Sequence, residues 1–136
     1  MSSARSGVFA AGDVARFPAS ALDMTMRAEH EDNAKRQGRL AGINMAGAEE
    51  TYDHLPFFYS DLFDLGYEAV GELDPRHETV VAWGEPNLKG LIYYLDGERH
   101  PRGVLLWNMF GRVDAARDLI RAHQSIEAGT LREPVG

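Results

Sequence analysis

The sequence predicts an α+β fold, in which an antiparallel sheet of about five strands is followed by a C-terminal helix and preceded by one strand and one helix. After residue 52, short aromatic and β-branched runs alternate with turn signals, which is typical of antiparallel strands. Residues 27–46 and 112–123 carry small or apolar residues at spacings of three and four, which is typical of helices. Because the strands follow one another without intervening helices, the pattern favours α+β over α/β.

The composition limits the classes of function. The chain has 136 residues, 14 Lys and Arg against 21 Asp and Glu, a formal net charge of −7 and no cysteine. The negative charge opposes unspecific binding to nucleic acid and to anionic membranes. The lack of thiols excludes disulfides, thiolate metal sites and cysteine nucleophiles. With no apolar run long enough for a membrane span and no signal-peptide pattern, the expected location is the cytoplasm.

The first predicted element is a buried strand over Gly7–Ala11, which ends at the turn signal Gly12-Asp13. A carboxylate at the carboxyl end of a strand can accept hydrogen bonds from the hydroxyls of a ribose or ribityl chain. Asp13 is therefore a candidate ligand-binding residue. The alternative is that Asp13 only caps the turn that follows it.

The second predicted element is a helix over residues 27–46, with Gly47 as its C-terminal cap. One face carries mostly small residues: Ala34, Gly38, Ala41 and Met45. We expect another backbone or a flat ligand to pack closely against this face. At the start of the helix, backbone N–H groups favour the acceptor atoms of a ligand, and His30 lies on the same side as Ala34 and Gly38, which makes this segment a candidate site. The alternative is a structural histidine beside acidic residues that stabilise the helix dipole.

The remaining elements are the strands and the last helix. The five strand runs are 57–59, 67–70, 79–83, 91–95 and 104–108. The strand over Gly90–Leu95 is expected to form a hairpin with Arg102–Asn108 through Asp96-Gly97. The last helix should present one stripe made of Val113, Ala116, Ile120 and His123. Three arginines are expected outside that stripe: Arg112, Arg117 and Arg121.

Several kinds of site are not supported by the spacing of residues. The five histidines, at positions 30, 54, 77, 100 and 123, are too far apart to form helix-borne pairs of metal ligands. No serine lies in a Gly-x-Ser-x-Gly turn, which argues against a hydrolase. The 14 glycines include no Gly-x-Gly, so the chain carries neither a GxGxxG dinucleotide motif nor a Walker A loop.

Several stretches in the same order resemble one family of flavoproteins. Val8–Ala15 resembles the second FAD-binding motif of pyridine nucleotide-dependent flavoprotein reductases. The chain is similar to the C-terminal part of apoptosis-inducing factor-like reductases, with ferredoxin and monodehydroascorbate reductases as relatives. The resemblance covers about residues 8–123, and it continues through six further stretches: Arg27–His30, Gly38–Gly47, Phe58–Leu62, Gly66–Gly71, Lys89–Leu95 and Val104–Phe110.

The resemblance implies roles for six residues. Asp13 would bind the ribityl or phosphate-proximal part of FAD, and Glu29 and His30 would lie near the isoalloxazine and the nicotinamide. Tyr59 stands where such proteins often carry a tryptophan that stacks near the flavin. Two further residues, Glu68 and Asn108, match positions on the nicotinamide side. No residue of this chain is expected to be catalytic by itself, because hydride transfer is the chemistry of the cofactors.

The resemblance also implies a division of the chain. Residues 1–47 would be the terminal strand and helix of an incomplete Rossmann-type FAD-binding domain, and residues 48–136 the reductase C-terminal interface or dimerisation domain. FAD and NAD(P)H would belong to the full-length relatives and would not be retained by this chain alone. The expected partners are N-terminal FAD and NAD domains or a second copy in a homodimer. The alternative is a stand-alone, non-enzymatic binding or oligomerisation module with the same fold.

Overall fold

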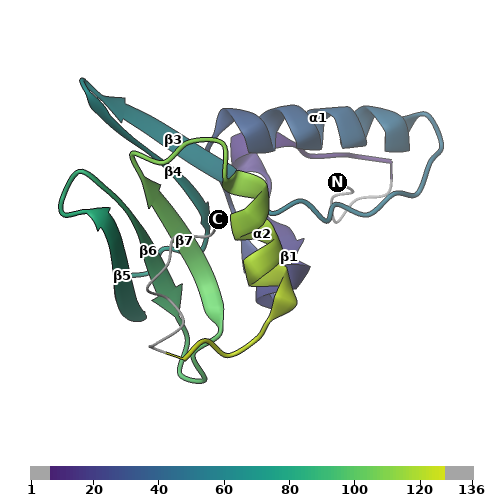
Figure 1. Cartoon of the computed structure of the whole chain (residues 1–136). Coiled ribbons are helices and arrows are strands. Elements are labelled where there is room, and N and C mark those ends of the chain that lie inside the picture. Colours follow the sequence, from purple (N-terminus) through teal and green to yellow (C-terminus); the bar gives the residue numbers. More distant parts are fainter. Residues whose placement is uncertain (1–6, 128–136) are drawn as a thin grey trace. The chain divides into compact units, whose positions relative to one another are not determined.

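The computed structural model describes residues 7–127 and divides the chain into two compact units, the first ending at Pro56 and the second beginning at Phe57. Figure 1 labels their helices and strands. Within the described residues, the first unit has a two-stranded sheet and the second a five-stranded antiparallel sheet, and each has one α-helix. The α+β fold class is confirmed. The predicted domain boundary at residues 47 and 48, which concerns the family's domains, stays a prediction.

In the first unit, a short β-ribbon precedes a long helix. The chain passes through the 3₁₀ turn η1 (Gly12–Val14), strand β1 (Phe17–Ala19), the 3₁₀ turn η2 (Ser20–Leu22) and strand β2 (Met24–Met26). Helix α1 (Glu31–Met45) follows. The side chains of Phe17 and Leu22 are each 1% exposed, so the ribbon and its connecting turn provide the apolar core of this unit.

The strand predicted over Gly7–Ala11 does not form. Val8 is 49% exposed, and Phe9 has only an isolated β-bridge. A short apolar run becomes a strand only when a neighbouring strand pairs along it, and β1 and β2 pair with each other instead. The β1–β2 ribbon therefore takes the place of the expected single strand.

Helix α1 is confirmed, but its buried face differs from the prediction. The buried residues are Asn33, Gln37 and Ala41, whereas Gly38 is exposed and Met45 is 70% exposed. The prediction was wrong because it assumed that polar residues of a helix face the solvent. At its C-terminal end the prediction is confirmed: Gly47 N–H donates to the Asn44 carbonyl at 3.1 Å, and Ala48 N–H to that of Ile43 at 3.3 Å. This pair of bonds is the Schellman motif.

The second unit is a five-stranded sheet with the order β3-β4-β7-β6-β5, and all neighbouring strands are antiparallel. The strands are β3 (Phe57–Leu62), β4 (Leu65–Gly71), β5 (Glu78–Glu85), β6 (Lys89–Leu95) and β7 (Pro101–Trp107). Each of the five predicted runs coincides with one of them. The predicted hairpin is confirmed, with Leu91 of β6 opposite Leu106 of β7.

The apolar core of the second unit lies on one face of this sheet. Its most buried side chains, each at most 2% exposed, are Val70, Leu91, Tyr93, Leu95, Val104 and Leu106. Helix α2 (Val113–Ala122) packs against β4 and β7, as Figure 1 shows, and its Ile120 is fully buried. The residues that alternate with the buried ones point to the other face of the sheet, where Trp83 is 40% exposed.

Arg117 of α2 corrects the prediction that it lies outside the packed stripe. Its side chain is 9% exposed, and its guanidinium lies over the Phe57 ring, 5.5 Å from the ring centroid. Its Nη1 also donates to Asp114 at 2.8 Å. An arginine can be buried when its charge meets an aromatic face and a carboxylate, and a hydrophobic pattern does not reveal such partners.

Candidate functional site

Asp13, the first predicted site residue, lies in the turn η1 of the first unit. The N–H of the preceding Gly12 donates to Oε1 of Gln37 at 2.9 Å, so the turn is attached to α1. Asp13 itself is exposed, and η1 has no side-chain capping bond at its N-terminal end. The carboxylate therefore faces solvent, where it can accept hydrogen bonds from a ligand.

Glu29 and His30 precede α1. Glu29 is exposed and forms an ion pair with Arg27. His30 is the N-cap residue of α1 and is half-buried, but its side chain makes no capping hydrogen bond. The first backbone N–H groups of an α-helix have no partner within the helix, and the N-cap side chain of α1 does not bond them. An acceptor group of a ligand would be stabilised there.

The first turn of α1 is also tied to the end of the first unit. Asp32 accepts from Arg36 Nε at 3.0 Å, and its other oxygen lies 2.6 Å from Nε2 of His54. Both side chains of the Asp32–His54 pair are about one-seventh exposed. His54 thus attaches the end of the first unit to α1. Among residues 7–127, no group of three or more His, Asp or Glu side chains could hold a metal ion.

Asn33 and Gln37 are the site-proximal residues that the sequence analysis missed. Both are 0% exposed, and Asn33 Nδ2 donates to the carbonyl of Ala28 at 2.9 Å. Asn33 Oδ1 accepts from the hydroxyl of Tyr52, also at 2.9 Å. Their spacing of four residues places them on one face of the helix. Polar residues at that spacing are also typical of an exposed face, so the sequence did not indicate that this face is buried.

Tyr59, Glu68 and Asn108 come together in the second unit. Tyr59 of β3 lies directly opposite Glu68 of β4, and the Tyr59 ring, which is 47% exposed, stacks on that of Phe57. Asn108 follows β7 with a φ of 53°, and its N–H donates to the Gly66 carbonyl on β4 at 2.7 Å. Tyr59 and Glu68 therefore face each other in the middle of the β3–β4 hairpin, and Asn108 lies just beyond the end of β7, beside Gly66.

Large apolar side chains are exposed beside this group. Phe63, at the turn between β3 and β4, has an exposed fraction of 106%, and Leu62 is 49% exposed. Phe110, just beyond Asn108, is 56% exposed, and its ring lies close to Gly66. Large contiguous patches of exposed apolar side chains are uncommon on monomeric proteins. We call this group of three side chains the hairpin-tip patch.

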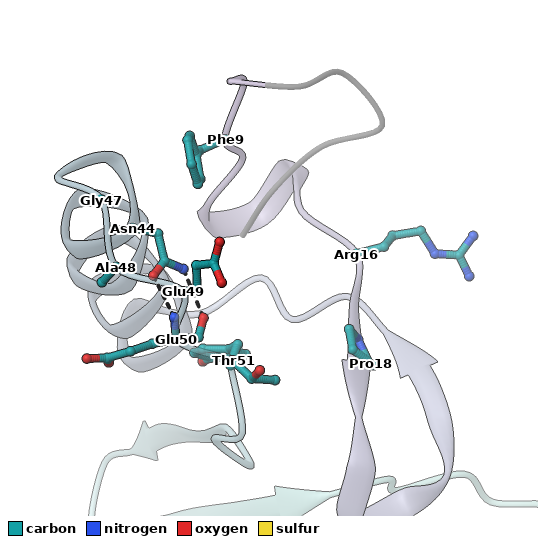
Figure 2. A pocket seen from close by; sticks show the side chains of 10 residues that line it. Phe9, Arg16, Pro18, Asn44, Gly47, Ala48, Glu49, Glu50 and Thr51 are labelled. Carbon is teal, nitrogen blue, oxygen red and sulfur yellow. Dashed lines mark hydrogen bonds between the residues drawn. The ribbon is translucent and has the colours of Figure 1, made fainter.

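The first unit contains a cavity of about 650 Å³. It lies between the C-terminal end of α1, the loop that follows it and the segment around Phe9 and Pro18. Figure 2 shows the Phe9 ring and the Asn44 side chain on its wall, and the Arg16 side chain extending away from α1. Asn44 also closes the loop by bonding both the N–H and the carbonyl of Glu50. None of the six predicted site residues lines this cavity.

Two carboxyl groups with lowered pKa values lie in turns of the second unit. Hydrogen bonds from the side chain and the backbone N–H of Arg76 lower the pKa of Asp74 to about 2. Burial alone would raise the pKa of Asp96, but hydrogen bonds from the N–H groups of His100 and Glu98 hold it below its ordinary value. Both groups stabilise turns and are separate from the predicted site residues. Within residues 7–127, neither helix has the length and apolar character that crossing a bilayer requires.

Comparisons with known proteins show what the chain is similar to. Residues 41–88 match the family model described as apoptosis-inducing factor, mitochondrion-associated, C-term. The mitochondrial apoptosis-inducing factor 1 of Dictyostelium discoideum is 38% identical over 135 residues, which cover 91% of this chain and 25% of that protein. Monodehydroascorbate reductase 3 of Arabidopsis thaliana is 43% identical over 70 residues, which cover 48% of this chain and 16% of that protein.

A solved structure, that of the protein Fdr9, has the same fold. It superposes with a TM-score of 0.75 at 26% sequence identity, over 92% of this chain and 33% of that protein. The chain therefore spans about a quarter to a third of the length of the apoptosis-inducing factor and of Fdr9. From the motif order, the family model and the shared fold, the chain is homologous to the C-terminal part of apoptosis-inducing factor-like, FAD-dependent pyridine nucleotide oxidoreductases.

Proposed function

We propose that this chain acts as the C-terminal domain of a flavoprotein NAD(P)H oxidoreductase, where it completes the flavin site and forms an interface with the other domains. The observation that supports this most strongly is the turn at Gly12-Asp13. Its amide is bonded to α1 and its carboxylate faces solvent. The Asp13 carboxylate can accept hydrogen bonds from the ribityl hydroxyls of a flavin. The N–H groups at the start of α1 can donate to acceptor atoms of the same ligand.

The groups present in the first unit fit one part of FAD. Asp13 would accept from the ribityl hydroxyls, and Glu29 and His30 would lie near the isoalloxazine. The N–H groups at the start of α1 would donate to its acceptor atoms. The pyrophosphate requires a glycine-rich turn, and the sequence contains no Gly-x-Gly. We therefore propose that this chain supplies the ribityl and ring contacts and that another domain supplies the phosphate contacts.

The second unit would contact the nicotinamide, which exchanges the hydride with the flavin. When bound, the flavin and the nicotinamide supply the redox chemistry itself. Tyr59 would offer its ring for stacking, since nearly half of the side chain is exposed. Glu68 and Asn108 would orient the nicotinamide side through polar contacts. The chain's residues would thus bind and orient the flavin and the nicotinamide, and none is proposed as a catalytic acid or base.

The hairpin-tip patch supports the proposed interface role. A fully exposed Phe63 beside the half-exposed Leu62 and Phe110 is costly in water, and its burial against another domain would recover about 25 cal/mol per Å² of apolar area. The proposed partners are FAD- and NAD(P)H-binding domains in the same polypeptide or complex, or a second copy of this chain. Exposed aromatic anchors of this kind dominate many protein interfaces.

A domain-replacement experiment tests the proposal. The matching quarter of the Dictyostelium discoideum apoptosis-inducing factor is replaced by this chain, and the same protein with that quarter deleted is the reference. We expect the chimera to retain FAD after gel filtration and to oxidise NADH with an artificial acceptor, and the deleted protein to lose both properties. A chimera that folds but releases FAD as readily as the deleted protein would contradict the proposal.

Matched variants separate the binding and interface roles in this chimera. Asp13→Asn should weaken FAD binding by about tenfold, because a carboxylate hydrogen bond is replaced by a neutral one. Asp118→Asn, on the exposed side of α2, removes the same charge elsewhere and should leave FAD affinity unchanged. Phe63→Ser should lower the melting temperature of the chimera but not that of the isolated chain. The opposite result would place Phe63 in the folding of this chain and not in its interface.

A further inference from the structure

Two side-chain amides on the buried face of α1 hold the two segments that the proposed function assigns to the flavin. Asn33 and Gln37 lie one helical turn apart, and both are 0% exposed. Asparagine and glutamine are mostly exposed in folded proteins, and buried polar groups are kept where they have hydrogen-bonding partners. The partners of these two amides therefore indicate what the amides do.

Gln37 holds the segment that carries Asp13. Its Oε1 accepts the N–H of Gly12 at 2.9 Å, across 25 residues of sequence. Gly12 has a φ of +78°, and a Cβ at this position would lie 3.7 Å from the Cβ of Ala34, so the turn rests on the helix surface. The direction of the Asp13 carboxylate follows from where this turn is attached.

The other end of the same amide strengthens the argument. Gln37 Nε2 is buried and has no hydrogen-bond partner among residues 7–127. A buried donor without a partner costs stability, and a leucine of similar size would avoid that cost. Since an apolar residue would suit the core better, the bond from Gly12 is what explains a glutamine here.

Asn33 holds the segment that carries Glu29 and His30. Its Nδ2 donates to the carbonyl of Ala28, the residue directly before them, at 2.9 Å. Its Oδ1 accepts from the Tyr52 hydroxyl at 2.9 Å, and the Tyr52 ring packs edge-on against Phe17, with the ring centroids 5.1 Å apart. The Tyr52 hydroxyl therefore holds the Asn33 side chain in place, and the Asn33 amide in turn holds the carbonyl of Ala28.

We infer that Asn33 and Gln37 are positioning residues, which attach Ala28 and Gly12 to one face of α1 and thereby set Asp13 relative to Glu29 and His30 for the flavin. This inference rests on the proposed function, since it concerns the groups that would face the cofactor. A rigid helix that carries both attachments keeps the groups preorganised before the ligand binds, which lowers the entropy lost on binding.

The attachment of Gly12 is tested in the 136-residue chain without flavin, by amide hydrogen exchange measured by NMR. Gln37→Leu removes the acceptor, Gln37→Glu keeps an oxygen in its place, and Arg39→Leu is an exposed control on the same helix. We expect Gln37→Leu to speed exchange at Gly12 by about tenfold with α1 still protected, and Gln37→Glu to restore the protection. Unchanged exchange at Gly12 in a folded Gln37→Leu chain would overturn the inference.

A second variant is available if Gln37→Leu does not fold. Gln37→Asn keeps the amide but is one methylene too short to reach Gly12, and the same tenfold increase is expected of it. For Asn33, Asn33→Asp keeps the acceptor for Tyr52 and loses the donor to Ala28, whereas Tyr52→Phe does the reverse. Faster exchange around Glu29 and His30 in Asn33→Asp but not in Tyr52→Phe supports the inference, and equal effects of the two variants contradict it.

The link to the cofactor is tested in the chimera described above. Gln37→Leu should raise the Kd for FAD by about tenfold, Gln37→Glu should restore it, and Arg39→Leu should leave it unchanged. If Gly12 is released but the Kd does not change, positioning for the flavin is refuted. If the unsubstituted chimera itself does not bind FAD, the proposed function fails and this inference fails with it, whatever the exchange rates show.

Discussion

Glu68 of β4 accepts a hydrogen bond from the backbone N–H of Gly111 at 3.1 Å, although 43 residues separate them in the sequence. Gly111 has a φ of +75° and belongs to the loop that begins at Asn108 and leads into α2. One carboxylate therefore connects the strand that faces Tyr59 to the loop that carries Asn108. This bond therefore attaches the loop of Asn108 to β4 at Glu68.

Glu68→Ala should release the loop. We expect the free energy of unfolding to fall by about 1 kcal/mol, the usual contribution of such a bond, and amide exchange to rise from Asn108 to Gly111. Glu68→Gln keeps a carbonyl oxygen near the same place and should lose less. Urea denaturation and hydrogen exchange measure the two effects. Equal losses in the two variants would show that the hydrogen bond is not what holds the loop.

Arg117 and Phe57 should be energetically coupled. The guanidinium lies 5.5 Å from the ring centroid and is largely buried, so the pair should contribute about 0.5–2 kcal/mol beyond its packing. A double-mutant cycle with Arg117→Met and Phe57→Leu measures this coupling by urea denaturation. Asp118→Asn, on the exposed side of α2, is the control and should change stability little. Additive losses from the two buried substitutions would show that the ring and the cation do not interact.

The parts of the fold that could be predicted are those with a repeating pattern. The five strands and their turns were found because aromatic and β-branched runs stand between turn signals, as Leu91–Leu95 stands before Asp96-Gly97. The end of α1 was found because Gly47 marks it. These signals come from residues that are close together in the sequence, so they can be recognised without knowledge of the folded structure.

What could not be predicted depends on a partner distant in sequence. The buried state of Gln37 and of Arg117 follows from Gly12 and from Phe57, which no periodicity connects to them. The strand expected at Gly7–Ala11 failed for the same reason, since pairing decides whether an apolar run becomes a strand. Local turn and helix-start signals pointed to Asp13 and His30, whereas Tyr59, Glu68 and Asn108 were found only through the family's motifs.

Gly90 should tolerate no side chain. A Cβ there would lie 2.5 Å from Cε3 of Trp83 and 2.7 Å from the carbonyl oxygen of Ala82, both on the neighbouring strand β5. Gly90→Ala should therefore displace the Trp83 ring and cost about 1–3 kcal/mol by overpacking. Gly97→Ala is the matched control, because no atom lies within 4 Å of the added Cβ. Tryptophan fluorescence and urea denaturation measure the two variants, and equal stability in both would contradict the close approach.

The stability of the chain should decrease at acidic pH, partly through the turn at Asp74. The pKa of this carboxyl is about 2 in the folded chain, below the value of about 3.9 for an unperturbed aspartate in an unfolded chain. A lowered folded-state pKa means that the unfolded state binds the proton more tightly, so the contribution is complete above about pH 4 and is lost as the pH falls toward 2. Asp96, whose pKa is also lowered, should act in the same direction. NMR titration of the Asp74 carboxyl measures the midpoint, and Arg76→Ala, which removes the guanidinium donor, should raise it toward the ordinary value. A midpoint that stays the same in Arg76→Ala would show that the arginine side chain does not stabilise the carboxylate.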